Sequence, residues 1–293
     1  MKISSILVIS DKQDKAQKAL AHAKLMVERF GAKLHVVAFS YERLQGLSPK
    51  LDEIQLEAVK SQVLSHQHQW LNEQISKFEL NAHASSEVVW EKDIASWVKQ
   101  HGAEHQYDLL LKTGHRSEGM FYVPTDWHLM RNGEIPVLLV AEKKWSKKRS
   151  IMVSLDMATK VKSKQALNHK LIDAGVMLSA ATGMPLHCCF CMPISPILKD
   201  LGVVKKSEVE AKAKQQYLPQ INQLLGEHQI PEKQIHIRAG ETKKIIPSVA
   251  SSVAAELVII GSVGRKGVKA KLLGNTAEEV LALLKTDVLV MQP

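Results

Sequence analysis

The sequence has few cysteines, few aromatic residues and no long apolar run. Its 3 cysteines, Cys188, Cys189 and Cys191, lie too close together to form a disulfide framework, and this usage is typical of a reducing compartment. Apolar runs such as Leu257–Ile260 are far shorter than the ~20 residues that span a bilayer, and Ile6–Ile9 is too short for the apolar core of a signal peptide. We therefore expect a cytoplasmic protein that does not insert into a membrane.

Positive charge is concentrated in the second half of the sequence. Up to Lys148 there are 20 basic and 18 acidic residues, and after it 19 and 12, which together give a net charge of +9. Most lysines are scattered through polar segments, as on a solvated surface, so we expect no nucleic-acid partner. The dense basic run 143–149 predicts an interdomain linker, although a basic run around Trp145 is also compatible with phosphate binding and base stacking.

The second half of the sequence repeats the first at a distance of about 148 residues. An apolar segment that ends in aspartate opens each half, at Ser5–Asp11 and at Ser150–Asp156. Each is followed by apolar residues at helical spacing, and each helical segment stops at a glycine, Gly31 or Gly183. Short apolar strands that alternate with amphipathic helices predict a parallel sheet covered on both faces. We therefore expect two tandem α/β domains, each a doubly wound five-stranded parallel sheet.

The repeat also sets the expected domain boundaries: a first domain over 1–144, a basic linker over 145–149 and a second domain over 150–293. The later strands are expected in pairs, at Glu87–Trp90 and Ile235–Arg238, at Asp108–Leu111 and Glu256–Ile260, and at Pro136–Val140 and Asp287–Val290. Ligands of such folds bind at the carboxyl ends of the strands. The residues that follow Leu155 and Ile260 are therefore candidate binding residues.

A glycine-rich segment follows the fourth expected strand of the second half. Gly261, Gly264 and Gly274 lie there, and Asn275 and Thr276 lead into an expected helix. Glycines let the backbone approach a ligand closely, and a helix N-terminus offers free N–H groups to phosphate oxygens. The segment is neither a P-loop nor a GxGxxG fingerprint. It indicates a nucleotide phosphate site, with tight turns and helix capping as the alternative.

The spacing Gly261-x2-Gly264-x9-Gly274, with Asp156 at the end of the first strand of that half, resembles the ATP-binding signature of the universal stress protein family. The resemblance extends over both halves and matches the tandem-domain form of the family. It implies two fused α/β domains in a cytoplasmic stress protein, homodimerisation, and the binding of ATP with or without Mg²⁺.

The resemblance also assigns roles to individual residues. It implies phosphate binding by Gly261, Gly264, Gly274, Asn275 and Thr276, and a contact of Asp156 with ribose or adenine. Arg265, on the same segment, is a candidate for neutralising phosphate charge. The family usually has Ser or Thr directly after the third glycine, whereas Asn275 intervenes here. Solvation of Arg265 and a capping or turn role for Asp156 remain the alternatives.

The first half has lost the glycine signature. Thr113, Arg116 and Asp126 stand where Gly261, Gly264 and Gly274 stand in the second half, and we expect no ATP binding of this kind there. Asp11, the counterpart of Asp156, is retained. Trp127 and His128 predict packing and a helix cap rather than a separate site.

The sequence holds no evident catalytic or metal-binding constellation. His66 and His68 do not share a helix face, and His101 and His105 are separated by Gly102, where we expect the helix to end. We predict buried apolar thiols for the three cysteines. A nucleophile elbow is absent and no acid pair stands out, so we expect no dedicated catalyst and at most weak ATP hydrolysis.

Two classes of function remain, with a third ranked last. The first is a stress protein whose second domain binds an adenine nucleotide as a switch or sensor. The alternative is a carrier or interaction protein that holds an apolar or amphipathic ligand between the tandem domains, which the lost glycines of the first half favour. The third is an ATP hydrolase or nucleotidyl transferase of the same fold, for which we can name no water-activating group.

Overall fold

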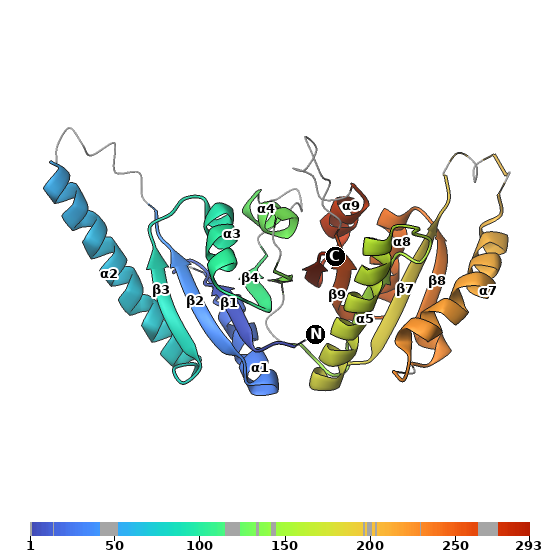
Figure 1. Ribbon diagram of the computed structural model, residues 1–293, viewed down its shortest axis with the longest axis horizontal. Helices are drawn as coiled ribbons and strands as arrows, with labels where there is room; N and C mark the ends of the chain where they lie inside the picture. The colour runs from blue at the N-terminus through green and yellow to red at the C-terminus, as the bar shows by residue number, and fades with distance from the viewer. Residues whose placement is uncertain are drawn as a thin grey trace. The chain divides into compact units, whose positions relative to one another are not determined.

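Strands and helices alternate along the chain in the computed structural model, and the predicted α/β class is confirmed (Figure 1). The structure describes residues 2–13, 15–41, 52–114, 124–132, 135–141, 145–195, 197, 201–202, 204–228, 230–262 and 275–293. Two compact units divide the chain, one formed by Lys2–Gly114 and the other by His115–Pro293. In the described residues, no helix is both long and apolar enough to cross a membrane.

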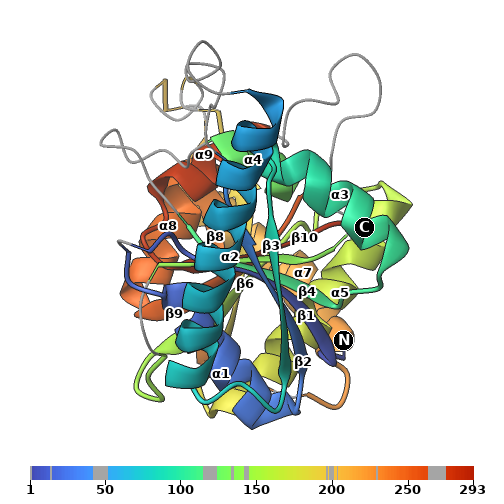
Figure 2. The same ribbon diagram turned by 90° about the vertical axis from the view of Figure 1, so that its left-hand side faces the viewer.

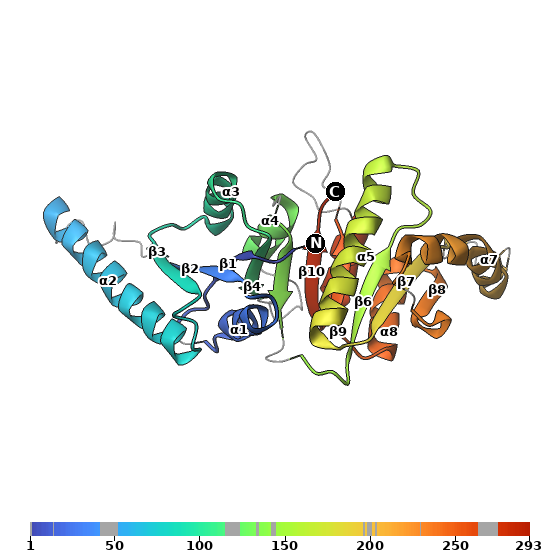
Figure 3. The same ribbon diagram turned by 60° about the horizontal axis from the view of Figure 1, so that its bottom comes forward.

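The smaller unit holds a parallel sheet with the strand order β3-β2-β1-β4. Its strands are β1 (Ser5–Ile9), β2 (Lys33–Phe39), β3 (Ala84–Val89) and β4 (Leu109–Thr113), and its helices are α1 (Lys18–Phe30), α2 (Glu53–Lys77) and α3 (Ile94–Glu104). Figure 3 shows α3 on one face of this sheet and α1 on the other, while α2 runs alongside β3 (Figure 2). A capping box starts α2, because Asp52 and Gln55 each accept a hydrogen bond from the other's backbone N–H.

The larger unit contains the second half of the sequence and the last elements of the first half. Its strand order is β5-β10-β9-β6-β7-β8. The strands are β5 (Val137–Val140), β6 (Ser150–Leu155), β7 (Leu186–Pro193), β8 (Ile235–Gly240), β9 (Ala255–Gly261) and β10 (Asp287–Met291). The helices are α4 (Pro124–Asn132), α5 (Lys162–Thr182), α7 (Lys206–Leu225), the 3₁₀ turn η2 (Glu232–Gln234), α8 (Thr242–Ser252) and α9 (Asn275–Leu283).

The strand register confirms the internal repeat. Ile6 lies opposite Leu109 in the first half, and Ile151 lies opposite Leu257 in the second. The first half has the strand order β4-β1-β2-β3, and the second half has the matching order β9-β6-β7-β8. In the second half, β10 lies next to β9 as one further parallel strand. β5 pairs antiparallel with β10, so the last strand of the first repeat joins the last strand of the second.

The segment between the repeats is tied to the second half by buried acids. The Trp145 indole N–H donates to Asp287 Oδ2 at 2.7 Å, and the Ser146 backbone N–H donates to Glu256 Oε2 at 2.5 Å. Asp287 is fully buried and also accepts from the backbone N–H of Ala141. Hydrogen bonds to buried acids of the second half therefore hold this part of the basic run in place.

Helix α5 packs closely on the sheet because Gly175 has no side chain. All six residues of β6 are buried beneath it, as expected for a sheet covered on both faces. A Cβ atom added at Gly175 would lie 2.6 Å from Val153 Cγ2 and 3.0 Å from Leu186 Cδ1. The helix therefore lies at a distance from β6 and β7 that only glycine permits.

We expect Gly175→Ala to destabilise the protein although alanine is the better helix former. The overlap with Val153 should cost about 1–3 kcal/mol, which exceeds the gain of about 1 kcal/mol in helix propensity. Urea unfolding measures the difference, with the exposed substitution Lys170→Ala in the same helix as the control. A more stable Gly175→Ala protein would contradict the close packing.

Candidate functional site

The predicted site lies at the carboxyl ends of β6 and β9. These strands are parallel neighbours with Ser154 opposite Ile260, so Asp156 and Ser262 follow them at one edge of the sheet. Gly264, Arg265 and Gly274 lie outside the described residues, as do the side chains of Asn275 and Thr276. The helix expected after the glycine segment is present as α9 and begins at Asn275.

Asp156 is held by its backbone, while its carboxylate faces solvent. Its N–H donates to Asn168 Oδ1 at 3.1 Å, and Asn168 Nδ2 donates to the carbonyl oxygen of Asp156 at 3.0 Å. The Asp156 side chain is 52% exposed, and Lys164 Nζ lies 3.6 Å from Oδ2. Asp156 does not cap α5, whose N-cap is Val161. The structure therefore presents an accessible carboxylate at a fixed position.

Gly261 has a packing role that its place in the motif did not indicate. A Cβ atom there would lie 2.6 Å from Leu167 Cδ2 and 3.3 Å from Leu171 Cδ1, both on α5. Its φ is not in the positive region, so a special backbone conformation is not what requires glycine. The absence of a side chain lets α5 cross the end of β9 closely, which shapes the edge beside Asp156.

Sequence reasoning did not single out Ser262, which directly follows Gly261. Ser262 is 1% exposed, and its backbone N–H donates to the carbonyl oxygen of Met291 at 2.8 Å. Its hydroxyl has no hydrogen-bond partner among the described residues. A buried hydroxyl at the entrance to the glycine segment is thus a further polar group of this edge, and its position after a strand end was the available signal.

The equivalent edge of the first half is closed by its own side chains. Asp11 is only 4% exposed, and the Thr113 hydroxyl donates to Asp11 Oδ2 at 2.7 Å. The same hydroxyl accepts from the backbone N–H of Ala19, at the start of α1, at 3.1 Å. Thr113 stands where Gly261 stands, so the side chain that replaces the glycine joins the aspartate to a helix N-terminus. Where the second half has the first glycine of its motif, the first half therefore has a hydrogen-bonded side chain that covers the aspartate.

Asp126 and Arg116 stand where the second half has the other two glycines of its motif. Asp126 is fully buried in the first turn of α4, and Arg116 lies outside the described residues. The guanidinium of Arg131 lies 5.5 Å from the Trp127 ring centroid and contacts Glu278 on α9 at 2.7 Å. Trp127 therefore packs against an ion pair, in keeping with the packing interpretation.

The three cysteines lie in β7 as buried free thiols, as predicted. Burial raises the pKa of both Cys188 and Cys189 to about 12, and it also raises the pKa of Cys191. The thiolate is the nucleophile and the metal ligand, and the raised pKa values favour the protonated thiol at neutral pH. The structure favours a packing role for them.

A histidine pair lies on the opposite side of β7 from Cys188. His187 Nδ1 and His236 Nε2, on β7 and β8, are 2.9 Å apart, and one of the two nitrogens donates a hydrogen bond to the other. Burial lowers the pKa of His236 to about 4, with smaller effects of His187 and Arg238, and burial also lowers the pKa of His187. Both rings are therefore neutral near pH 7.

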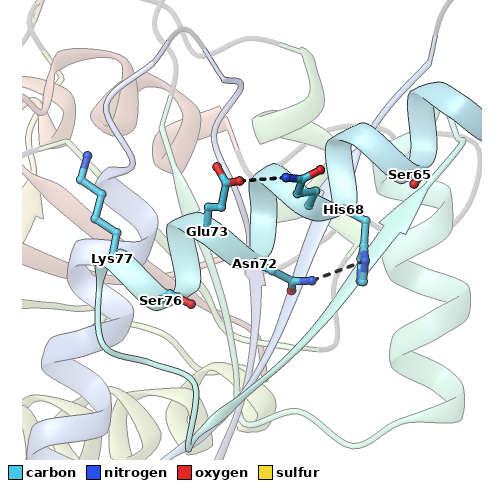
Figure 4. Close-up of a pocket in the computed structure, with 7 residues that line it drawn as sticks. Ser65, His68, Asn72, Glu73, Ser76 and Lys77 are labelled. Carbon is cyan, nitrogen blue, oxygen red and sulfur yellow. Dashed lines mark hydrogen bonds between the residues drawn. The ribbon is translucent and has the colours of Figure 1, made fainter.

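A shallow pocket of about 830 Å³ lies along α2, on elements other than β6 and β9 (Figure 4). Its polar side chains largely bind one another: Gln69 donates to Glu73 at 3.3 Å, and His68 and Asn72 lie 3.4 Å apart. Ser86 of β3 donates to Asn72 Oδ1 at 2.7 Å. The polar side chains that line this pocket therefore form hydrogen bonds with one another or with β3, and these contacts give no reason to place a ligand there.

We expect Thr113→Val to destabilise the protein by about 1–3 kcal/mol. The substitution keeps the shape but leaves the buried Asp11 carboxylate and the Ala19 N–H without the bridging hydroxyl. Equilibrium urea unfolding measures the loss, and Thr113→Ser, which retains the hydroxyl, serves as the control. Equal stability of the valine variant and the parent would show that the bridge contributes nothing.

We expect stability to fall as the pH drops from 6.5 to 4, in part because of His236. Its pKa is about 4 in the folded state against an ordinary 6.5, so the unfolded chain binds the proton first in this window. His236→Gln cannot titrate, and its stability should decline less steeply over the same range. Thermal unfolding at several pH values is the measurement, and parallel curves for variant and parent would refute the assignment.

The sequence profile of the universal stress protein family matches residues 2–141 and 149–292. Universal stress protein E of Escherichia coli K12 is 32% identical, over 99% of this chain and 94% of that protein. The universal stress protein E homolog of Haemophilus influenzae is 30% identical, over 100% and 98%.

Solved structures agree on the fold. A putative universal stress protein from Pseudomonas aeruginosa UCBPP-PA14 gives a TM-score of 0.72 at 23% identity, covering 99% of this chain and 94% of that one. A universal stress protein from Archaeoglobus fulgidus gives 0.65 at 15% identity, covering 98% of each chain. Two tandem family matches and full-length relatives together establish that this chain belongs to the universal stress protein family and is a stress-response protein.

Proposed function

We propose that this protein binds ATP through its second half and acts as a switch or sensor in the stress response, not as a dedicated catalyst. The observation that carries the proposal is the difference between two equivalent aspartates. Asp156 presents an accessible carboxylate beside the start of the glycine segment, whereas Asp11 is buried under Thr113. The second half keeps an exposed carboxylate at this strand edge, whereas the side chain of Thr113 covers the equivalent aspartate of the first half.

The chemistry of the open edge suits an adenine nucleotide. The carboxylate of Asp156 is an acceptor for ribose hydroxyls or for the adenine amino group. Gly261, Gly264 and Gly274, with the N-terminus of α9 at Asn275 and Thr276, are proposed to offer backbone N–H groups to the phosphates, and Arg265 to offset their charge.

One acidic residue near this helix N-terminus needs a partner if phosphate is to bind there. Glu278 lies in the first turn of α9, where its charge would repel a phosphate. Arg131 donates to Glu278 Oε1 from both Nε and Nη2, at 3.1 and 2.7 Å, and so offsets that charge. The ion pair thereby leaves the helix N-terminus compatible with an anion.

The remaining features of the proposal rest on the family resemblance and the repeat. We propose a domain over 1–144, a linker over 145–149 and a domain over 150–293, which the family matches to 2–141 and 149–292 support. We also propose a cytoplasmic homodimer that binds ATP with or without Mg²⁺ and hydrolyses it weakly at most.

We expect Gly264→Val to abolish ATP binding and Asp156→Ala to weaken it by about 10- to 100-fold. The first change removes backbone approach to the phosphates, and the second removes hydrogen bonds to a charged acceptor worth about 1.5–3 kcal/mol. Isothermal titration with ATP, with Mg²⁺ and with chelator, measures both. Arg116→Ala and Asp173→Ala, an exposed acid on α5, should bind like the parent.

Native mass spectrometry of the freshly purified protein separates the two classes of function. One adenine nucleotide per chain supports the proposal. A released apolar or amphipathic molecule, together with no response to added ATP, would overturn it in favour of a carrier. ATP affinity unchanged in both Gly264→Val and Asp156→Ala would instead show that the nucleotide binds elsewhere.

A further inference from the structure

Three metal-ligating side chains from different elements meet on one face of the first half. His35 lies on β2, Glu87 on β3 and His101 on α3, and one ligand atom of each lies within 4.8 Å of the others. The register of the strands brings the first two together, because His35 lies opposite Ser85 and Glu87 follows two residues later on the same face. All three side chains are partly exposed, so the cluster is accessible to a solute.

We propose that His35, Glu87 and His101 bind one late first-row divalent cation, of which Zn²⁺ is the representative. Two imidazoles and one carboxylate form a three-ligand set that suits zinc. His35 Nε2 and Glu87 Oε2 are 3.0 Å apart, and they would have to separate only to the distance of about 3.4 Å that tetrahedral bonds of about 2.1 Å require. A ligand atom of His101 lies within 4.8 Å of both, so a shared ion requires the ring to move toward them.

Neighbouring hydroxyl groups orient both imidazole rings. Without an ion, His35 Nε2 donates to Glu87 Oε2; an ion would take the place of that proton. Nδ1 would then be the donor of the ring, and Ser85 Oγ, which lies 2.9 Å from Nδ1 and donates to the carbonyl oxygen of Leu34, can accept from it. Tyr107 OH lies 2.9 Å from His101 Nε2. Hydroxyl partners on the outer nitrogens are the arrangement that fixes a histidine as a metal ligand.

The packing around His101 favours the neutral ring that a metal requires. The ring stacks on Trp97 at 4.3 Å and on His105 at 4.2 Å. Burial lowers the pKa of His101, with smaller contributions from His105 and His35, while Glu87 and Glu104 act in the opposite direction. The lone pair is therefore available near neutral pH, and acid should release the ion.

A cavity supplies room for a further ligand. It has a volume of about 330 Å³, and its lining includes His35, Ser85, His105 and Tyr107. A three-residue zinc site completes its coordination with water, and of the three proposed ligands the cavity is lined by His35. The cluster also lies on elements other than β6 and β9, so it is independent of the proposed nucleotide site.

The second half provides a natural control for this cluster. His187 and His236 occupy the positions on β7 and β8 that match His35 on β2 and Glu87 on β3. In the described part of the chain no third ligand joins this pair. The two rings are bonded to each other at 2.9 Å. Substitution of His236 therefore removes a histidine from an equivalent location without touching the proposed site.

Isothermal titration of the chelator-treated full-length protein with zinc chloride near neutral pH tests the proposal. We expect one saturable ion per chain, weakened at least about tenfold by Glu87→Gln and by His35→Asn, and unchanged by His236→Gln. Magnesium chloride should not compete, because Mg²⁺ prefers all-oxygen ligands. Thermal unfolding without metal checks that each variant is folded. If Glu87→Gln does not fold, Glu87→Asp, which moves the carboxylate by one methylene, takes its place.

Each result of the zinc titration either supports or overturns the proposed site. Saturable binding that both substitutions weaken, and that mildly acidic buffer reverses, supports the site. The absence of a saturable site, or equal zinc affinity in the parent and in folded Glu87 variants, overturns it. Loss of binding in His236→Gln alone would place the ion on the histidine pair of the second half and would likewise overturn it.

Discussion

In each half of the protein, an amide side chain exchanges two hydrogen bonds with the backbone of the aspartate that follows the first strand. Gln17 binds the N–H and carbonyl of Asp11, and Asn168 binds those of Asp156. The contact fixes where each aspartate leaves the sheet without using its carboxylate. Both strand edges depend on this arrangement, because it leaves the aspartate carboxylate available either for a buried hydrogen-bond network or for contact with solvent.

The two halves have used this freedom differently. In the first half, Thr113 draws the carboxylate inward, and the aspartate becomes part of a buried network that joins β1, β4 and α1. In the second half, Gly261 offers no side chain to Asp156, and α5 crosses the strand end closely instead. A single position, threonine or glycine, thus separates an edge whose aspartate is buried from one whose aspartate side chain is 52% exposed.

Much of this organisation could be predicted from the sequence, and the reasons for the remainder are physical. The buried apolar strands and the glycine stops after α1 and α5 follow local rules, so the repeat and the fold class were predictable. The packing role of Gly261 was not, because it depends on Leu167 of a distant helix.

The cluster of His35, Glu87 and His101 was missed for the same kind of reason. Its members come from three separate segments, so no local spacing reveals them. The expectation that the helix ends at Gly102 was wrong, since α3 runs through to Glu104. Sequence reasoning compared His101 only with His105, on which its ring does stack, whereas the structure also brings it to residues of β2 and β3.

The antiparallel pairing of β5 with β10 means that each repeat covers an edge strand of the other. A fragment cut within the linker would leave the N–H and C=O groups of β10 without the strand that covers them, and an uncovered strand edge is a template for aggregation. The pairing therefore makes the duplication hard to reverse. A gene that lost either copy would have to acquire a new partner for that edge at the same time, for example by self-association.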